Sequence, residues 1–188
     1  MTMTDTGMEA TEVPELALSI TAKATTLARM VAGVSVAAGS DKARPILTAI
    51  EFDADPNGEG HGLTLAATDS YRLAMVGSED IEGYGYALIP AKGITEAAKA
   101  MIRTLGKRSN AEATLTATRS TWRLAYPGGE FVGGTEQGTY PSWRQLVPWG
   151  GGLGVAGSMP AYNPAFLADL GKLAKAIEAP KEMPVRVV

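Results

Sequence analysis

The chain contains no cysteine and a single histidine, so several common kinds of functional chemistry have little material to work with. Disulfides and thiolate metal sites are excluded, and a reducing, cytoplasmic environment is the expected location. His61, in the loop sequence DPNGEGHG, cannot alone build a zinc site or a nucleophile–histidine pair, and a histidine in such a loop is typically solvated. We therefore expect a protein that is not an enzyme and holds no metal or cofactor.

Long apolar segments are absent as well. No run of eighteen apolar residues occurs, which excludes a membrane-spanning helix. The N-terminal stretch MTMTDTGMEATEVPE lacks the basic and apolar regions of a secretory signal. Its threonines and acids predict a disordered leader over residues 1–14. The remaining length is enough for one domain and part of a second.

Positive charge is not in excess, since the formal net charge is −3, which argues against a general nucleic-acid binder. The distribution of the bases is uneven, however. Residues 20–40 contain two bases and no acid, and residues 91–108 contain five bases against one acid, Glu96. The bases are therefore concentrated where the sequence has helical periodicity.

Three stretches have that periodicity, beginning near residues 22, 92 and 163. Their apolar residues recur at the i, i+3, i+4 spacing of a helix with one buried face. Asn163-Pro164 is a typical start for the third helix, and Pro180 follows its end. The apolar positions are Leu27, Met30, Val31 and Val34, then Ile94, Ala97, Ala98, Met101 and Leu105, and then Phe166, Leu170, Leu173 and Ile177.

Between these helices the pattern changes to alternating apolar and polar residues, which is typical of strands. LALSI and YALIP precede the first two helices, and sequences such as GLTLAAT and EATLTAT follow them. The unit is strand–helix–strand–strand–strand, written twice and begun a third time. This predicts an α+β fold in which two such half-units form antiparallel sheets with the helices on one face.

One phrase occurs in both half-units. ATDSYRLA at residues 67–74 is followed by ATRSTWRLA at residues 117–125, so that the arginines Arg72 and Arg123 are 51 positions apart. We interpret the doubled phrase as part of the structural repeat.

The first copy belongs to a longer phrase that resembles the bacterial sliding clamp family, the beta subunit of DNA polymerase III. LAATDSYRLAMV at residues 65–76 is similar to the family phrase ATDGHRLA, and TYPSWRQLVP at residues 139–148 is similar to FPDYRRVLP. RPIL at residues 44–47 and the helix after LIPAKG also match. The resemblance covers about residues 15–148 and is greatest with the clamp's middle domain.

The resemblance implies a processivity factor in DNA replication, a homo-oligomeric ring with helices lining a hole around duplex DNA and sheets outside. It also implies a pocket that binds short hydrophobic peptides of DNA polymerase and the clamp loader. In this chain the corresponding peptide-binding residues are Leu47, Thr68, Ser70, Tyr71, Arg72, Leu73, Pro141, Gln145 and Leu146.

Three positions depart from the family pattern. Ser70 and Tyr71 stand where glycine and histidine are usual, and Gln145 replaces an arginine. A turn that needs a positive φ would strain a serine, and the preference for peptides is expected to differ. For three residues of these phrases there is an alternative to a role at the peptide pocket. Arg72 could instead form an ion pair with Asp69 in the turn, and Tyr140 and Trp143 could instead pack in an interface.

The predicted second helix carries a cationic face suited to phosphates. Lys92, Glu96, Lys99 and Arg103 step by four, three and four residues opposite the apolar positions, so they share one side of the helix, and three of the four are cationic. Such a face contacts the DNA backbone without selecting a sequence. The alternative is that these side chains are simply solvated. The candidate DNA-binding residues are Arg29, Lys42, Arg44, Lys92, Lys99 and Arg103.

The C-terminal part predicts a glycine-rich linker over residues 149–161 and a partial further clamp-like unit over residues 162–188. A clamp protomer of the family has three full domains, whereas this chain has little more than one. Either the chain is a fragment, or many copies complete each other's sheets, or it is a short phage-type relative that does not encircle DNA.

Two other functions compete with that of a clamp. A binding module could keep the peptide pocket alone, acting as a decoy or adaptor at a replication clamp without encircling DNA. An enzyme or metal site would use the acids Asp53, Asp55, Glu59 and Asp69 near His61. That loop lacks the closing glutamate of a calcium-binding EF-hand.

Overall fold

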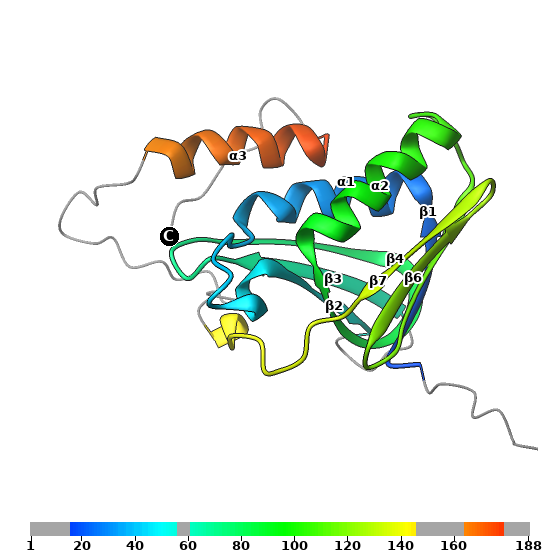
Figure 1. Ribbon diagram of the computed structural model, residues 1–188. Helices are drawn as coiled ribbons and strands as arrows, with labels where there is room; N and C mark the ends of the chain where they lie inside the picture. The colour runs from blue at the N-terminus through cyan, green and yellow to red at the C-terminus, as the bar shows by residue number, and fades with distance from the viewer. Residues whose placement is uncertain (1–15, 56–60, 146–163, 179–188) are drawn as a thin grey trace, which may run out of the picture.

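An antiparallel sheet forms one layer of the molecule, and the helices lie together on one of its faces (Figure 1). The structure, a computed structural model, describes residues 16–55, 61–145 and 164–178. Within these ranges the elements are β1 (Leu18–Lys23), α1 (Ala24–Val34), η1 (Ser35–Ala37), η2 (Pro45–Thr48), β2 (Ala49–Ala54), β3 (His61–Thr68), β4 (Leu73–Pro90), α2 (Ala91–Leu105), β5 (Glu112–Ala117), β6 (Thr121–Tyr126), β7 (Gly129–Gly134), η3 (Trp143–Gln145) and α3 (Pro164–Ala176). The α+β class predicted from the sequence is confirmed.

The sheet joins the two half-units by exchanging their first strands. The strand order is β2-β3-β4-β1-β5-β6-β7, with an additional pairing of β2 with β4. β1, which opens the first unit, pairs with β5 of the second unit. The end of β4, which opens the second unit, pairs with β2 of the first unit. Each unit therefore completes the other, and the described domain has an internal two-fold repeat.

β4 is long because it serves both units. Its first part, residues 73–78, pairs with β3, and residues 82–85 and 85–90 pair with β1 and β2. The sequence predicts YALIP as a strand of its own, whereas the structure makes it the end of this continuous 18-residue strand. Gly85 allows the close packing, since its φ is +93° and a Cβ there would lie 2.1 Å from the carbonyl oxygen of Ala17.

The doubled phrase does not occupy equivalent places in the two units. Residues 67–74 connect β3 to β4, the second and third strands after a helix, whereas residues 117–125 connect β5 to β6, the first and second. Our interpretation of the phrase as part of the repeat is therefore wrong, although the repeat itself exists. What the copies share is a turn held by a threonine. Thr118 Oγ1 accepts the backbone N–H of Thr121 (3.1 Å), and Thr68 Oγ1 accepts that of Ser70 (3.1 Å).

The main core lies between the sheet and the helices. Alternate strand residues point into it, including Ile20, Phe52 and Leu65, all at most 1% exposed. The apolar faces of α1 and α2 cover them, as the helical spacing predicts; Val31 and Ile94 are completely buried. α2 ends at Gly106, whose φ of +87° is easily adopted only by glycine.

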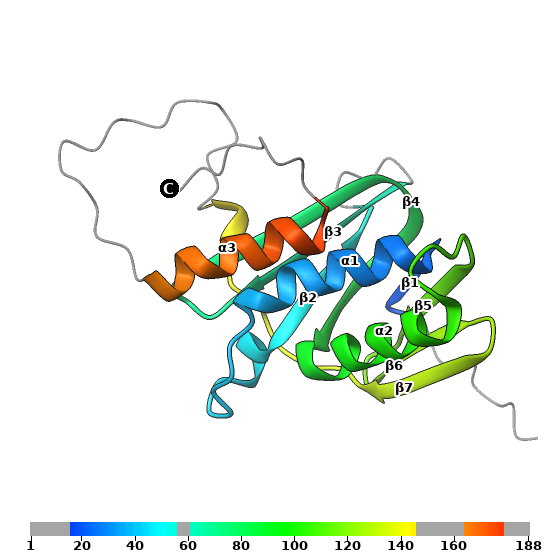
Figure 2. The same ribbon diagram turned by 90° about the horizontal axis from the view of Figure 1, so that it is seen from above.

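The third helix lies beside α1, on the side opposite α2 (Figure 2). Gly33 lets the two helices come close, because a Cβ there would lie 3.1–3.2 Å from the side chains of Ile177 and Leu173. The predicted leader and linker lie outside the described residues, as do residues 162–163 and 179–188 of the predicted further C-terminal unit. In the part of the chain that the structure describes, no helix is long and apolar enough to cross a membrane.

Candidate peptide site and cationic helix face

A second apolar cluster lies on the outer face of the sheet, away from α1 and α2. Strand residues that alternate with the inward ones form it together with the segment that follows β7. Its buried members are Ala49, Ala66, Leu88, Tyr140 and Trp143, and the half-buried Ile46, Leu73 and Met75 pack against them. We call these residues the outer cluster. The two phrases that carry the family resemblance, far apart in sequence, therefore meet on one surface.

Tyr140 connects the two phrases directly. Its hydroxyl accepts a hydrogen bond from the backbone N–H of Thr68 (3.2 Å) and donates one to the carbonyl of Ala49 (3.3 Å). The side chain is 5% exposed, and this burial is the main reason why the pKa of Tyr140 is raised above its ordinary value. The phenol therefore stays neutral and can keep both contacts.

A buried carboxylate anchors the next residues of the segment. Glu51 points outward from β2 but is only 4% exposed, because Trp143 covers it and donates its indole N–H to Glu51 Oε2. Arg144 adds contacts of 3.4 Å to Glu51 and 2.6 Å to Asp53, and its guanidinium lies 4.4 Å from the centre of the Trp143 ring. Burial raises the pKa of Asp53, against the opposing effect of Arg144. Sequence reasoning missed this network.

The turn between β3 and β4 is organised by the side chains of its own phrase. Thr68 Oγ1 donates to the carbonyl of Arg72 (2.7 Å), and Asp69 Oδ1 accepts the backbone N–H groups of Tyr71 (3.0 Å) and Arg72 (3.1 Å). Ser70 has a φ of +79°, the left-handed conformation that favours glycine. Serine in place of glycine at this position therefore strains the backbone.

Arg72 is held on two sides. It forms the ion pair with Asp69 expected from the sequence, with 2.9 Å between Nε and Oδ2, and a second, closer one with Asp169 of α3. Its guanidinium also lies 4.8 Å from the centre of the Phe166 ring, a cation–π arrangement. The hydrogen bonds that Lys172 and Arg72 donate to Asp169 lower the pKa of that carboxyl. α3 thus covers the arginine that the resemblance assigns to peptide binding.

The remaining candidate peptide residues differ in what they expose. Leu73 is a half-buried member of the outer cluster. Leu47 is only 6% exposed, so at η2 it is Ile46 that contributes to the cluster. Tyr71 is 78% exposed at the turn. Pro141 and Gln145 are exposed at the edge of the segment, and Leu146 lies outside the described residues.

Two residues that contribute to this surface were missed by sequence reasoning. Ile46 and Met75 are half-buried members of the outer cluster. The strand alternation places Met75 on the same face as Leu73 and could have identified it. No sequence signal identifies Ile46, which depends on how η2 folds against β2.

The candidate DNA-binding residues fall into two groups. Lys92, Lys99 and Arg103 are exposed along α2, and Arg29 lies on neighbouring α1, where it pairs with Glu178 at the end of α3 (3.0 Å). Arg44 lies elsewhere; it pairs with Asp41 (3.3 Å) and reaches Ser70 Oγ (3.5 Å).

Lys42, the sixth candidate, is exposed in the loop before η2. The cationic helix face, meaning Arg29, Lys92, Lys99 and Arg103, is therefore separate from Lys42 and Arg44.

The acids of the competing metal hypothesis are engaged elsewhere. Asp53 pairs with Arg144, and Asp69 pairs with Arg72. Within residues 16–55, 61–145 and 164–178, no three His, Asp or Glu side chains come together closely enough to hold a metal ion. Glu59 lies outside these ranges.

Comparison with known proteins agrees with this geometry. Residues 21–107 match the model of a family described as the DNA polymerase III beta subunit, central domain. The chain is 36% identical over 141 residues to the beta sliding clamp of Micrococcus luteus, an alignment that covers 72% of this chain and 43% of that protein. The chain belongs to the sliding clamp family. The recognition made from the two phrases is confirmed.

Other clamps are similar over a comparable part of the chain. The beta sliding clamp of Synechococcus elongatus is 27% identical over 148 residues, covering 76% of this chain and 38% of that one. The chain thus spans less than half the length of these relatives.

Solved clamp structures show the same fold. The sliding clamp of Bacillus subtilis has a TM-score of 0.60 at 24% identity, covering 76% of this chain and 36% of that one. A Pseudomonas aeruginosa clamp bound to griselimycin also has a TM-score of 0.60, at 21% identity, covering 77% and 37%.

Proposed function

We propose that this protein is a clamp-like processivity factor without enzymatic activity. Its cationic helix face contacts duplex DNA without selecting a sequence, and its outer cluster binds short hydrophobic peptides of a DNA polymerase or clamp loader. The observation that carries the proposal is the division of the sheet: one face supports helices with exposed cations, and the other holds an apolar cluster beside both clamp phrases.

The helix face suits a backbone contact that slides. Lys92, Lys99 and Arg103 are exposed along one helix, and each can meet a phosphate separately. Single, screened contacts of this kind exchange readily along a duplex, because every position offers the same phosphates.

The sheet edges support assembly of several copies. Among the described residues, β7 pairs only with β6, and residues 73–78 of β4 pair only with β3. β7 also exposes Phe131 and Val132, the latter at 63%. Two different open edges on one domain fit head-to-tail contacts that can close into a ring.

The outer cluster suits the apolar side chain of a peptide. Leu73, Met75 and Ile46 are half-buried, so they offer apolar surface without being part of the main core. Thr68 and Arg72 beside them can orient polar groups of the peptide. A ligand that reaches Arg72 has to displace or accommodate α3, since Asp169 and Phe166 occupy that side chain.

DNA binding is tested by its salt dependence. Fluorescence anisotropy with a 30-base-pair duplex is measured at increasing salt for the native protein and for the triple variant Lys92→Ala/Lys99→Ala/Arg103→Ala. Each lost phosphate contact lowers the slope of log K against log salt by about 0.9, so the variant should lose about 2.7. The control Arg119→Ala removes an exposed cation from the β5–β6 turn and should leave the slope nearly unchanged. Equal slopes for the native protein and the triple variant would refute the DNA contact.

Peptide binding is tested at Leu73. A synthetic polymerase-tail peptide should bind the native protein and lose at least tenfold in affinity with Leu73→Ala, which removes apolar surface at the outer cluster. Val132→Ala on β7 is the matched control, exposed and remote from the cluster. Peptide binding without any DNA binding would favour the decoy or adaptor function instead.

A further inference from the structure

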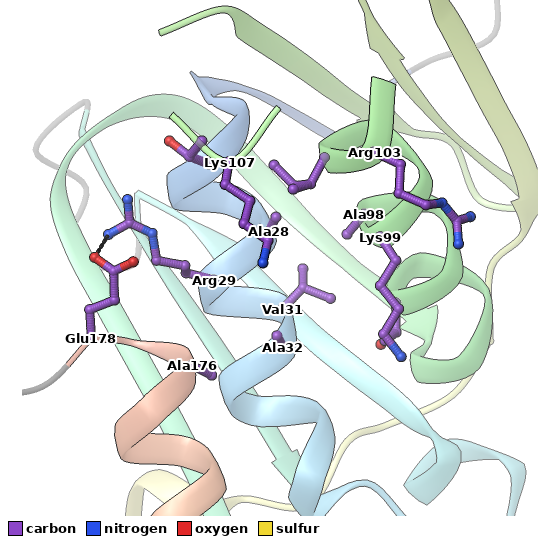
Figure 3. A pocket seen from close by; sticks show the side chains of 13 residues that line it. Ala28, Arg29, Val31, Ala32, Ala98, Lys99, Arg103, Lys107, Ala176 and Glu178 are labelled. Carbon is purple, nitrogen blue, oxygen red and sulfur yellow. Dashed lines mark hydrogen bonds and ion pairs between the residues drawn. The ribbon is translucent and has the colours of Figure 1, made fainter. Parts of the chain in front are cut away.

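A groove lies across the outer side of the helix layer, between α1 and α2 and bordered by the end of α3 (Figure 3). Its volume is about 450 Å³, within the range of about 300–1,000 Å³ typical of ligand sites. Small and apolar side chains form the floor: Ala28 and Ala32 on α1, and Ala98 and Ile102 on α2. The small side chains of Ala28, Ala32 and Ala98 leave open the space between the two helices.

The rim of this groove is cationic. Lys99 and Arg103 project from α2, Arg29 from α1, and Lys107 extends from the segment after α2 toward α1 (Figure 3). Glu178 is the acidic residue of the lining and pairs with Arg29. The rim therefore carries a net positive charge of about three, which favours an anionic ligand.

The wall of the groove also holds a polar atom with no hydrogen-bond partner in the part of the chain that the structure describes. Thr95 Oγ1 is buried and makes no hydrogen bond to any of the described residues. Buried hydroxyls are nearly always hydrogen-bonded, because leaving one unpaired costs free energy. A bound ligand with a donor or acceptor at this depth would satisfy it.

Duplex DNA matches the rim but not the floor. Its phosphates and sugars are polar and would leave the alanines and Ile102 uncovered. A ligand that matches both has apolar side chains and carboxylates in one short segment. We propose that the groove binds an acidic, amphipathic peptide segment of a partner protein, with its apolar residues on the floor and its carboxylates on Lys99, Arg103 and Lys107.

Such a peptide and DNA would exclude each other. Lys99 and Arg103 belong both to the groove and to the cationic helix face, so one ligand neutralises the charges that the other needs. The partner would thereby control when the protein engages DNA. Only this consequence rests on the proposed function; binding of the peptide is measured without DNA.

The test uses three synthetic helical peptides that differ in one property each. The first places leucine and glutamate on opposite faces, the second replaces glutamate by glutamine, and the third replaces leucine by serine. Binding to the native protein is followed by fluorescence anisotropy at physiological salt. We expect the first peptide to bind and each of the others to bind at least tenfold more weakly. The glutamine peptide lacks the carboxylates that contact the rim, and the serine peptide lacks the leucines that contact the floor.

Two variants and a control assign the binding to the groove. Ala32→Phe fills the floor and should abolish binding, and Lys107→Ala should weaken it roughly tenfold by removing one rim charge. Lys92→Ala is the matched control, because Lys92 is an exposed lysine of the cationic helix face that does not line the groove. Circular dichroism establishes whether each variant is folded. If Ala32→Phe does not fold, the surface substitution Lys107→Ala still decides the test. Equal effects of Lys107→Ala and Lys92→Ala, or equal binding of the glutamine peptide, would overturn the proposal.

Discussion

The hydrogen bond from Trp143 to buried Glu51 is expected to be a principal contribution to the stability of the outer cluster. Replacing Trp143 by phenylalanine keeps an aromatic ring against β2 but removes the indole N–H. Glu51, 4% exposed, then loses a donor that cannot be replaced from water without opening the site. Two other partners of Glu51 remain and compensate only in part: Arg144, at 3.4 Å, and the side chain of Tyr86, whose pKa is raised by burial and further by the charge of Glu51 and its hydrogen bond to Glu51.

The size of the effect follows from the burial of both partners. Removing a hydrogen bond to a charged group costs about 1.5–3 kcal/mol, and the smaller ring adds about 1 kcal/mol of lost packing. The free energy of unfolding should therefore fall by roughly 2.5–4 kcal/mol. Urea denaturation measures it: with a slope of about 1–3 kcal/mol per molar, the midpoint moves by at least about 1 M.

Trp122→Phe is the control for the loss of ring volume. Trp122 is also nearly buried, at 4% exposed, but it belongs to the main core, and among the described residues no carboxylate hydrogen-bonds to it. This variant should lose only about 1 kcal/mol. If the two substitutions destabilise the protein equally, the hydrogen bond to Glu51 contributes nothing measurable and the reasoning is refuted.

Three further predictions concern the turn, α3 and β4. Ser70→Gly should raise the free energy of unfolding by about 0.5 kcal/mol. It relieves a left-handed φ that costs serine roughly 1–2 kcal/mol, and this gain exceeds the ~0.5–1 kcal/mol by which glycine favours the unfolded chain through its added entropy. A decrease in stability, measured by urea denaturation, would contradict this. The lowered pKa of Asp169 means that its contribution to the α3 contact is present above the unfolded value of 3.8 and is lost as pH falls through the folded value. Ring NMR shifts of Phe166 should therefore change as pH falls below about 4, and Asp169→Asn should abolish that dependence. Gly85→Ala should cost about 3 kcal/mol or more, since its Cβ would clash with a backbone carbonyl. Gly77→Ala in the same strand, with 3.8 Å to the nearest atom, should cost under about 1 kcal/mol; similar losses for both would refute the clash.

Much of the local structure could be predicted because it depends on neighbours in sequence. The spacing of Leu27, Val31 and Val34 requires a helix with one buried face, and the structure has α1 at Ala24–Val34. The alternation in β3 places Leu65 and Ala67 inward. The Asp69–Arg72 pair and the strain at Ser70 were also foreseeable, since they arise within four residues.

Contacts between distant segments could not be predicted in the same way. Glu51 in a strand is ordinarily a solvated position, and only the return of residues 139–145 across β2 buries it. The contact between Arg72 and Asp169 spans 97 residues, and no periodicity relates them. The groove depends on how far apart α1 and α2 pack, which is set by side chains across the whole core.

The sequence by itself determined the elements, the two half-units and the phrases that place the chain in the sliding clamp family. These follow from periodicity and from residues adjacent in the chain. The tertiary structure alone decided that the half-units exchange their first strands, that α3 lies over Arg72, and that a cationic groove opens between α1 and α2. These features arise where elements distant in sequence share a surface, and packing rather than local pattern determines which surfaces meet.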